Sequence, residues 1–374
     1  MSLAIDFVGT NIGSGTKTYN IYFCKVLQKT KIDENIYIFL SKNYYNEIKF
    51  LKKNPKIKFI IKSNIFSNIF IRLFWMQFCL PFSLKMRGIN KLFSPMNICP
   101  IFNLFNIKII LGLHSNLPWI YFKFMPGNFI KKYITKKIME FSIYRSNLII
   151  IPSIFAKKEI QKKLKLKKKI KVINHGVKID YRENLNKKEK FQFKNTKYFL
   201  SILSCVKYHN ILNLLKAYKS LIKKKKINLK FIIVMQVLDK KYFNQISDFV
   251  LKNFKKKDLI LINDLSFLNI IKLYDHSKFY IFSSYCEVFG FTTLEAMSRN
   301  IPVLTSNKSA LPEINGNAAI YFDPDNLKDI EYKIYKINNS KILRKKLIRR
   351  GKKHVRKFSW EKCVTKTLSC INSL

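Results

Sequence analysis

Residues 283–326 read SSYCEVFGFTTLEAMSRNIPVLTSNKSALPEINGNAAIYFDPDN and contain the features that decide the fold. An apolar run that predicts a strand ends near Ser283, and a Phe-Gly-Phe turn follows it. Residues 292–295 then have the S/T-x-x-E form of a capping box, which predicts the start of a helix. A helix that opens at the carboxyl end of a strand is typical of a parallel α/β sheet, where ligands bind at that edge. Its free N–H groups and its dipole attract phosphate.

The same alternation of strand and helix runs through both halves of the chain, which predicts two doubly wound α/β domains. A length of 374 residues agrees with two domains. Strands are expected in the first half at residues 3–8, 36–40, 91–93, 107–113 and 148–151, and in the second half at 198–206, 229–235, 259–262 and 279–283. Residues 42–90 show no clear pattern.

We therefore expect an N-terminal domain over residues 1–180 and a C-terminal domain over residues 197–356. The polar, Lys-rich residues 181–196 are the expected linker. The last helix, within residues 357–374, is expected to cross back onto the first domain.

The charge of the chain is strongly positive. Lys and Arg number 71 against 22 Asp and Glu, a formal net charge of +49, which favours polyanionic partners such as nucleic acid or an acidic membrane surface. Only nine of these cations are Arg, whereas a surface selected to bind phosphates would contain more. Lys, Ile, Asn, Phe and Tyr are all abundant and share A/T-rich codons. We therefore interpret much of the charge as compositional bias.

The sequence also predicts the compartment. Seven cysteines without a C-x-x-C pair cannot form a fully paired set of disulfides, which favours a reducing environment. The residues that open the chain lack the pattern of a secretory signal. The most apolar run, residues 66–82, contains Arg72 and is too short to span a membrane. We expect a cytoplasmic protein, and the spacing of His, Cys, Asp and Glu predicts no metal site.

A second candidate site is the glycine turn that follows the first predicted strand. Gly13 and Gly15 flank Ser14 immediately before a helical pattern begins. Glycines at such a turn let the backbone approach a ligand closely and offer N–H groups to a diphosphate. The turn matches neither the dinucleotide fingerprint nor a Walker A loop, so taken by itself it favours a plain turn.

The motif in residues 287–295, two glutamates separated by seven residues, resembles that of the retaining, sugar-nucleotide-dependent glycosyltransferases of the GT-B fold. This is the large bacterial glycosyl group 1, or family 4, type of mannosyl- and glucosyltransferases. The resemblance continues through Ile301-Pro302, Leu311-Pro312-Glu313, Gly316-Asn317-Ala318 and Asp323-Pro324. It implies two Rossmann-like domains with parallel sheets facing across a cleft.

The resemblance also implies a reaction. The enzyme would move a hexose from a GDP- or UDP-sugar to a glycan or lipid-linked acceptor, in the synthesis of a cell-surface polysaccharide or lipopolysaccharide. It implies no required metal or cofactor, and front-face attack with the leaving diphosphate as base.

Roles for individual residues follow from the same resemblance. Glu295 would hold the ribose hydroxyls of the donor, and Glu287 would touch the transferred sugar. Backbone amides at Gly290, Phe291 and Thr292 would meet the sugar and the diphosphate.

The first domain would contribute the remaining contacts. Gly13 and Gly15 would approach the diphosphate from that side, and His114, at a predicted strand end, would lie near the donor sugar. A lone His at a strand end is also consistent with a purely structural role, which is the role expected for His175.

One departure from the family pattern concerns charge. Relatives usually place an Arg, and five positions later a Lys, after the first strand of the second domain. The corresponding residues here are Ser204 and His209. A neutral imidazole stabilises a departing diphosphate less well than a cation does. Our hypothesis is that Lys207 supplies the missing charge, and a protonated His209 is the alternative.

Three further interpretations remain open. Residues 56–87 are basic and rich in aromatic side chains, and are a candidate for binding an anionic inner-membrane surface. A relative that binds nucleotide sugars without transfer is consistent with Ser204 and His209. A nucleic-acid-binding protein is supported by charge alone, and we expect no nucleic-acid partner.

Overall fold

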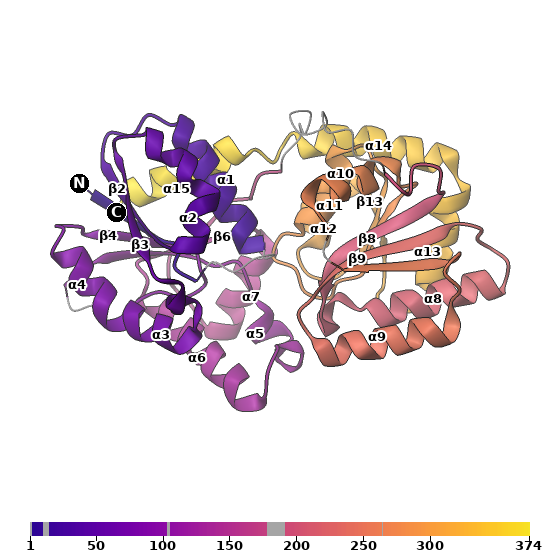
Figure 1. Cartoon of the computed structure of the whole chain (residues 1–374), viewed down its shortest axis with the longest axis horizontal. Helices are drawn as coiled ribbons and strands as arrows, with labels where there is room; N and C mark the ends of the chain where they lie inside the picture. Colours follow the sequence, from indigo (N-terminus) through magenta and orange to yellow (C-terminus); the bar gives the residue numbers. More distant parts are fainter. Residues whose placement is uncertain (1, 10–14, 103–104, 178–190, 264) are drawn as a thin grey trace. The chain divides into compact units, whose positions relative to one another are not determined.

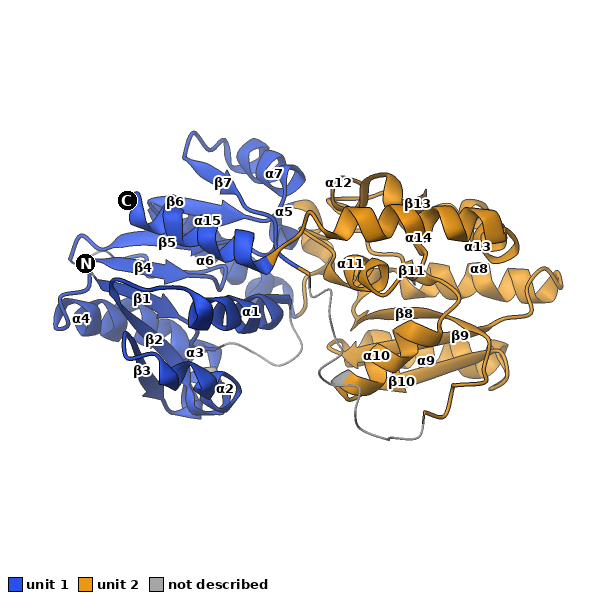
Figure 2. Cartoon of the chain, turned by 90° about the horizontal axis from the view of Figure 1, so that it is seen from above, with its two compact units in different colours: residues 1–119, 127–176, 360–374 blue, residues 120–126, 177–359 orange. Residues whose placement is uncertain are grey.

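The computed structural model describes residues 2–9, 15–102, 105–177, 191–263 and 265–374 (Figure 1). The chain divides into two compact units (Figure 2). Unit 1 comprises residues 1–119, 127–176 and 360–374, and unit 2 comprises residues 120–126 and 177–359. In the described part of the chain, no helix combines the length and the apolar character that crossing a membrane requires.

Unit 1 is built on a seven-stranded sheet in the order β3-β2-β1-β4-β5-β6-β7, and all neighbouring strands pair in parallel. Its strands are β1 (Ser2–Asp6), β2 (Asn35–Ser41), β3 (Ile57–Lys62), β4 (Lys91–Ser94), β5 (Lys108–Gly112), β6 (Leu148–Ile151) and β7 (Ile170–Val172). The central strands are buried along most of their length, because helices cover both faces of a parallel sheet.

The helices of unit 1 lie on both faces of this sheet. They are α1 (Gly15–Lys29), α2 (Lys42–Ile48), α3 (Ile69–Phe74), α4 (Leu80–Lys85), α5 (Leu117–Ile120), α6 (Phe129–Arg145), α7 (Ile154–Leu164) and α15 (Trp360–Asn372). A π turn, η3 (Trp75–Cys79), joins α3 to α4. Helices α1 and α15 cover one face, and α3, α4 and α6 the other (Figure 1). The residues without a sequence pattern, 42–90, therefore contain one strand and several short helices.

Unit 2 has a six-stranded parallel sheet in the order β10-β9-β8-β11-β12-β13. Its strands are β8 (Tyr198–Cys205), β9 (Lys230–Val237), β10 (Leu259–Asn263), β11 (Tyr280–Phe282), β12 (Val303–Ser306) and β13 (Ala319–Phe322). Its helices are α8 (Ile211–Lys223), α9 (Lys240–Asn253), α10 (Phe267–His276), α11 (Phe291–Ser298), α12 (Leu311–Asn315), α13 (Leu327–Asn339) and α14 (Lys341–Val355).

The strand order of unit 2 reverses between β8 and β11. From β8 the chain moves outward through β9 to β10, then returns to place β11 on the other side of β8. At such a reversal the loops after the two central strands diverge and leave a crevice at their carboxyl ends, where ligands bind in open α/β sheets. The loops after β8 and β11 are therefore the ones that the fold positions for a site.

Helix α15 packs onto unit 1 through Trp360. The indole stacks on the ring of Tyr22 of α1, with centroids 5.0 Å apart, and the Cα of Gly176 faces the same residue. A Cβ placed on Gly176 would lie 2.3 Å from the backbone nitrogen of Trp360 and 2.6 Å from its Cα. Glycine is thus required at position 176 for the backbone of α15 to approach.

We expect Gly176→Ala to destabilise the fold by about 1–3 kcal/mol, because the backbone of α15 must move away from its contacts. Denaturant titration followed by circular dichroism measures the effect. Gly88→Ala is the control: a Cβ there meets nothing within 4 Å, so its cost is limited to the positive φ of +65°. Equal losses in the two variants would contradict this account of the α15 contact.

Candidate active site

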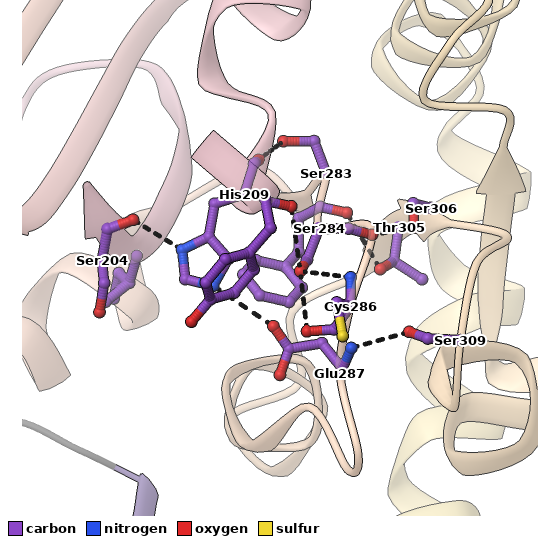
Figure 3. A network of polar contacts seen from close by, with 12 residues as sticks. Ser204, His209, Ser283, Ser284, Cys286, Glu287, Thr305, Ser306 and Ser309 are labelled. Carbon is purple, nitrogen blue, oxygen red and sulfur yellow. Dashed lines mark hydrogen bonds and ion pairs between the residues drawn. The ribbon is translucent and has the colours of Figure 1, made fainter. Parts of the chain in front are cut away.

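The loops after β8 and β11 bring a histidine and a glutamate together (Figure 3). His209 ends the short 3-10 helix η6 (Lys207–His209) that follows β8, and Glu287 lies in the loop after β11. The imidazole Nε2 is 3.3 Å from Glu287 Oε1, and the imidazole Nδ1 is 2.6 Å from the backbone carbonyl oxygen of Ser204. The histidine is buried and the carboxylate is largely shielded.

The contact with Ser204 identifies which nitrogen of His209 carries a hydrogen. A backbone carbonyl only accepts hydrogen bonds, so Nδ1 of His209 must carry the hydrogen that it donates to Ser204. Nε2 is then the atom that faces Glu287 Oε1, and the two side chains form an ion pair when the imidazole is protonated at Nε2 as well.

Hydroxyl groups hold the loop that carries Glu287 (Figure 3). Ser309 Oγ accepts a hydrogen bond from the backbone N–H of Glu287 at 2.9 Å, and Ser283 Oγ donates to the carbonyl of His209 at 2.6 Å. Ser306, at the end of β12, donates to the carbonyl of Ser284. Because backbone groups on both loops have side-chain partners, the positions of His209 and Glu287 are fixed relative to each other.

Helix α11 begins in a way that the sequence did not predict. Its N-cap is Gly290, with φ of +86°, and its first helical residue is Phe291. The expected capping box is therefore wrong: Thr292 lies inside the first turn, and Thr293 Oγ1 donates back to the carbonyl of Gly290 at 2.8 Å. The physical reason is the left-handed conformation of Gly290, which only glycine adopts readily and which starts the helix earlier.

The start of α11 is suited to an anion. Gly290 has no side chain with which to cap the helix, and a Cβ there would lie 2.7 Å from Leu311 Cδ2. The dipole makes this end partly positive, and its first amides precede the regular hydrogen bonds of the helix, although the N–H of Thr293 already contacts the carbonyl of Gly290 at 3.3 Å. The residues expected to meet a diphosphate, Gly290, Phe291 and Thr292, are the ones that form this end.

Glu295 lies one turn further along α11. Tyr274, from the end of α10, directs its hydroxyl at Glu295 Oε2 over 3.4 Å. Burial raises the pKa of the Glu295 carboxyl to about 7, and the contact with Tyr274 opposes that rise. A carboxyl held in this way ionises near neutral pH and can then accept hydrogen bonds from two neighbouring hydroxyls of a sugar.

His114 lies in unit 1, after β5, and is not isolated there. Its Nδ1 is 3.2 Å from Nε2 of His175, and the ring of Tyr19 packs against it with centroids 4.6 Å apart. Burial lowers the pKa of His114 to about 4, so the ring is neutral at neutral pH. Its Nε2 has no hydrogen-bond partner in the described part of the chain. That atom is itself buried.

The remaining predicted residues are placed as follows. Gly15 opens α1, one turn before the Tyr19 that packs on His114. Gly13 lies outside the described residues. Lys207 is exposed at the start of η6, and the described structure shows no contact between it and Glu287.

Three residues around these groups were missed from the sequence as partners. Tyr274 faces Glu295, Ser309 fixes Glu287, and His175 contacts His114. The position of His175 could have been noticed in the sequence, because it follows strand β7 in the same way that His114 follows β5. Nothing in the sequence marks Tyr274 or Ser309. Among the described residues, no group of His, Cys, Asp and Glu is arranged to hold a metal.

The second half of the chain matches a known protein family. Residues 182–354 match the model of the family described as glycosyl transferases group 1. O-antigen chain mannosyltransferase RfbU of Salmonella typhimurium is 28% identical over 223 residues, which are 58% of this chain and 57% of that protein. O-antigen chain mannosyltransferase B of Escherichia coli is 34% identical over 102 residues, 27% of each chain. The chain thus aligns with less than two-thirds of either relative.

Solved structures resemble the chain over its whole length. A glycosyltransferase from Rickettsia africae ESF-5 superposes with a TM-score of 0.72 at 20% identity, covering 100% of this chain and 98% of that one. Anabaena Alr3699/HepE, solved in complex with UDP and glucose, gives a TM-score of 0.73 at 13% identity, with both chains covered completely. Likeness at this level shows the fold, and the expected GT-B fold with its two parallel α/β sheets is confirmed.

The raised pKa of Glu295 predicts how stability depends on pH. The folded state holds this proton up to about pH 7, whereas the unfolded chain releases it near 4.5. Stability from this group is therefore complete below about pH 4.5 and is lost as the pH rises to 7, by up to about 3 kcal/mol. Glu295→Gln cannot ionise, so the variant should gain stability relative to the natural chain between pH 5 and 8.

The measurement is the free energy of unfolding of both chains by denaturant at several pH values. The difference between them isolates Glu295 from other titrating groups. A constant difference between Glu295→Gln and the natural chain would contradict the assignment.

Proposed function

We propose, on the premise that residues 182–354 belong to the glycosyl transferases group 1, that the chain is a retaining hexosyltransferase. It moves a hexose from a GDP- or UDP-sugar to a glycan or lipid-linked acceptor. The relatives named for O-antigen synthesis support a role in cell-surface polysaccharide or lipopolysaccharide assembly. The enzyme works in the cytoplasm, at the inner face of the membrane where a lipid-linked acceptor is exposed.

One observation carries the proposal. The two loops at the strand reversal of unit 2 place His209, Glu287 and the start of α11 at the carboxyl ends of β8 and β11. This is where an open α/β sheet binds ligands. Glu295 on the same helix adds a carboxylate for a vicinal diol. A nucleotide sugar has the matching groups: a ribose diol, a diphosphate and a sugar rich in hydroxyls.

The roles follow from the chemistry of each group. Glu295, once ionised, accepts hydrogen bonds from the two ribose hydroxyls. The amides at the start of α11 receive the diphosphate, and Glu287 accepts from a hydroxyl of the hexose. When the bond between the anomeric carbon and the diphosphate oxygen breaks, negative charge grows on that oxygen. Donors aimed at such a charge in a shielded site supply a large share of catalysis.

The acceptor hydroxyl then forms a bond to the anomeric carbon on the face that the diphosphate leaves. Its proton passes to a diphosphate oxygen, so no protein nucleophile is needed and the anomeric configuration is retained. A nucleoside diphosphate and the extended acceptor are the products. His114, whose ring is neutral, would lie near the transferred sugar.

His209 supplies the positive charge that relatives obtain from other residues. Its imidazole is buried and lies 3.3 Å from Glu287, whereas Lys207, our hypothesis from the sequence, is exposed. The carbonyl of Ser204 accepts the hydrogen of Nδ1 and so directs Nε2 toward Glu287.

His209 variants test this assignment through kcat. His209→Gln should lose roughly 10²-fold in kcat because a cation next to the leaving group is removed. His209→Lys should keep activity, since an ammonium supplies a positive charge at the same position.

Lys207→Ala serves as the control and should behave as the natural chain does. If Lys207→Ala lost turnover and His209→Gln kept it, the charge would belong to Lys207 instead.

A screen of donors tests the proposal as a whole. Melting temperatures are measured with GDP-mannose, UDP-glucose, UDP-N-acetylglucosamine and UDP-galactose, because a ligand that binds only the folded state raises the melting temperature. We expect one of them to raise it by several degrees, and Glu295→Ala to abolish the rise. A donor that binds but is never transferred or hydrolysed would support the rival role of a sugar-nucleotide-binding relative, with which Ser204 and His209 are also consistent.

A further inference from the structure

One helix of unit 1 is apolar on two opposite sides. Helices α3 and α4 and the π turn between them run without a break from Ile69 to Lys85. The inner side buries Trp75, Met76, Leu80 and Leu84 against the sheet. This side is sufficient to attach the helix to the unit, because one apolar stripe is what a surface helix needs.

The outer side presents a second stripe, which packing does not require. We call it the phenylalanine face; it consists of Phe70, Phe74, Phe78, Phe82, Met86 and, from a neighbouring loop, Phe102. These residues are 47% to 86% exposed. Every exposed phenylalanine of the described chain lies in unit 1, although unit 2 has large apolar residues at its surface as well.

The π turn keeps this stripe straight. Residues four apart on an α-helix are rotated by about 40° with each step, so a spacing of four would wind around the helix. A π turn takes in an extra residue and reverses part of that rotation. The turn at Trp75–Cys79 lies in the middle of the stripe, between Phe74 and Phe82. The phenylalanine face is therefore a feature of the backbone as well as of the sequence.

The only charged side chain between residues 69 and 84 points inward. Arg72 is 7% exposed and lies against Gly9, where a Cβ would come within 2.6 Å of Arg72 Cδ. It also attracts the buried Asp6, whose pKa burial raises to about 6. The outer surface of this part of the helix consequently contains no charge at all.

The face is held rigidly. Gln77, between the two stripes, accepts a hydrogen bond from the N–H of Ile101 at 2.7 Å, and Ser142 of α6 accepts one from the N–H of Cys99 at 3.1 Å. The loop that carries Phe102 is thereby tied to both helices, and Phe102 packs on Phe78 with centroids 5.9 Å apart. The first turns of α6 add the exposed Phe129 and Ile130.

The stretch of sequence that carries these apolar side chains is basic. From residue 48 to residue 139 it contains 14 Lys and two Arg and neither Asp nor Glu; of these cations, Arg72 and Lys91 are buried. Lys85 and Arg87, at the end of α4, are exposed next to Met86. An anionic bilayer complements both properties, because its interface accepts aromatic side chains and its headgroups attract Lys and Arg. A second copy of this chain would bring a further +49 and be repelled.

We propose that the phenylalanine face inserts into the headgroup region of an anionic membrane and holds unit 1 on its surface. The inference rests on the proposed function for its purpose, since it brings the enzyme to a lipid-linked acceptor. Its test needs no donor and no transfer. Two contributions act together, apolar insertion and attraction of the basic region, which is the combination that stable peripheral binding needs.

The experiment measures co-flotation of the purified chain with vesicles of phosphatidylcholine, alone or mixed with phosphatidylglycerol. We expect binding to the mixed vesicles, weakened by high salt. The double variant Phe74→Ser, Phe78→Ser should lower the partition coefficient at least roughly tenfold, because two phenylalanines no longer leave water. Leu251→Ser, Ile342→Ser in unit 2 is the matched control, since both residues are exposed apolar side chains away from the face.

Further outcomes decide the remaining alternatives. Equal binding by the Phe74, Phe78 variant and the natural chain, or no binding to anionic vesicles at low salt, would overturn the proposal. So would loss of self-association, or of single-stranded DNA binding, in that variant while vesicle binding stays unchanged. An unaltered melting temperature shows that the variant folds. Donor binding by the same samples separates the two proposals, because it does not depend on the face.

Discussion

The contact between His209 and Glu287 is the interaction on which the candidate site depends. It joins the loop after β8 to the loop after β11 across the point where the strand order reverses. Nδ1 of His209 donates to the carbonyl of Ser204, so Nε2 is the atom that faces Glu287. Hydroxyls from Ser283 and Ser309 then fix the backbone on both sides.

The sequence predicted those strands and helices in which the apolar residues recur with one regular spacing. Strands buried on both faces, such as β6 and β8, read as short apolar runs, and the amphipathic helix α8 showed a clear helical pattern. Residues 42–90 showed none, and the reason is physical. The helix from Ile69 to Lys85 is apolar on two sides and contains a π turn, so neither its periodicity nor its spacing matches an ordinary surface helix.

In the candidate site, the two glutamates were predictable from the sequence, but the residues that contact them were not. Glu287 and Glu295 stand out in sequence because their surroundings form a recognisable motif, and both lie beside the reversal point of unit 2. No sequence motif indicates the contacts between residues that are far apart in the chain. Tyr274 reaches Glu295 from another helix, and His175 meets His114 over 61 positions. The start of α11 was misplaced because the pattern of Thr292 and Glu295 fits a capping box, while Gly290 begins the helix with a conformation that letters alone do not reveal.

The path of the chain between its units has a consequence for how this protein can be altered. The boundaries at 119/120, 126/127, 176/177 and 359/360 mean that each unit is assembled from separate stretches, and the first boundary falls inside α5. Cutting once between the halves would strip the first unit of its closing helix. A chimaera that takes its N-terminal half from this protein, in evolution or in the laboratory, must therefore take residues 360–374 from it as well. Otherwise Tyr22 and Gly176 lose their contacts with Trp360.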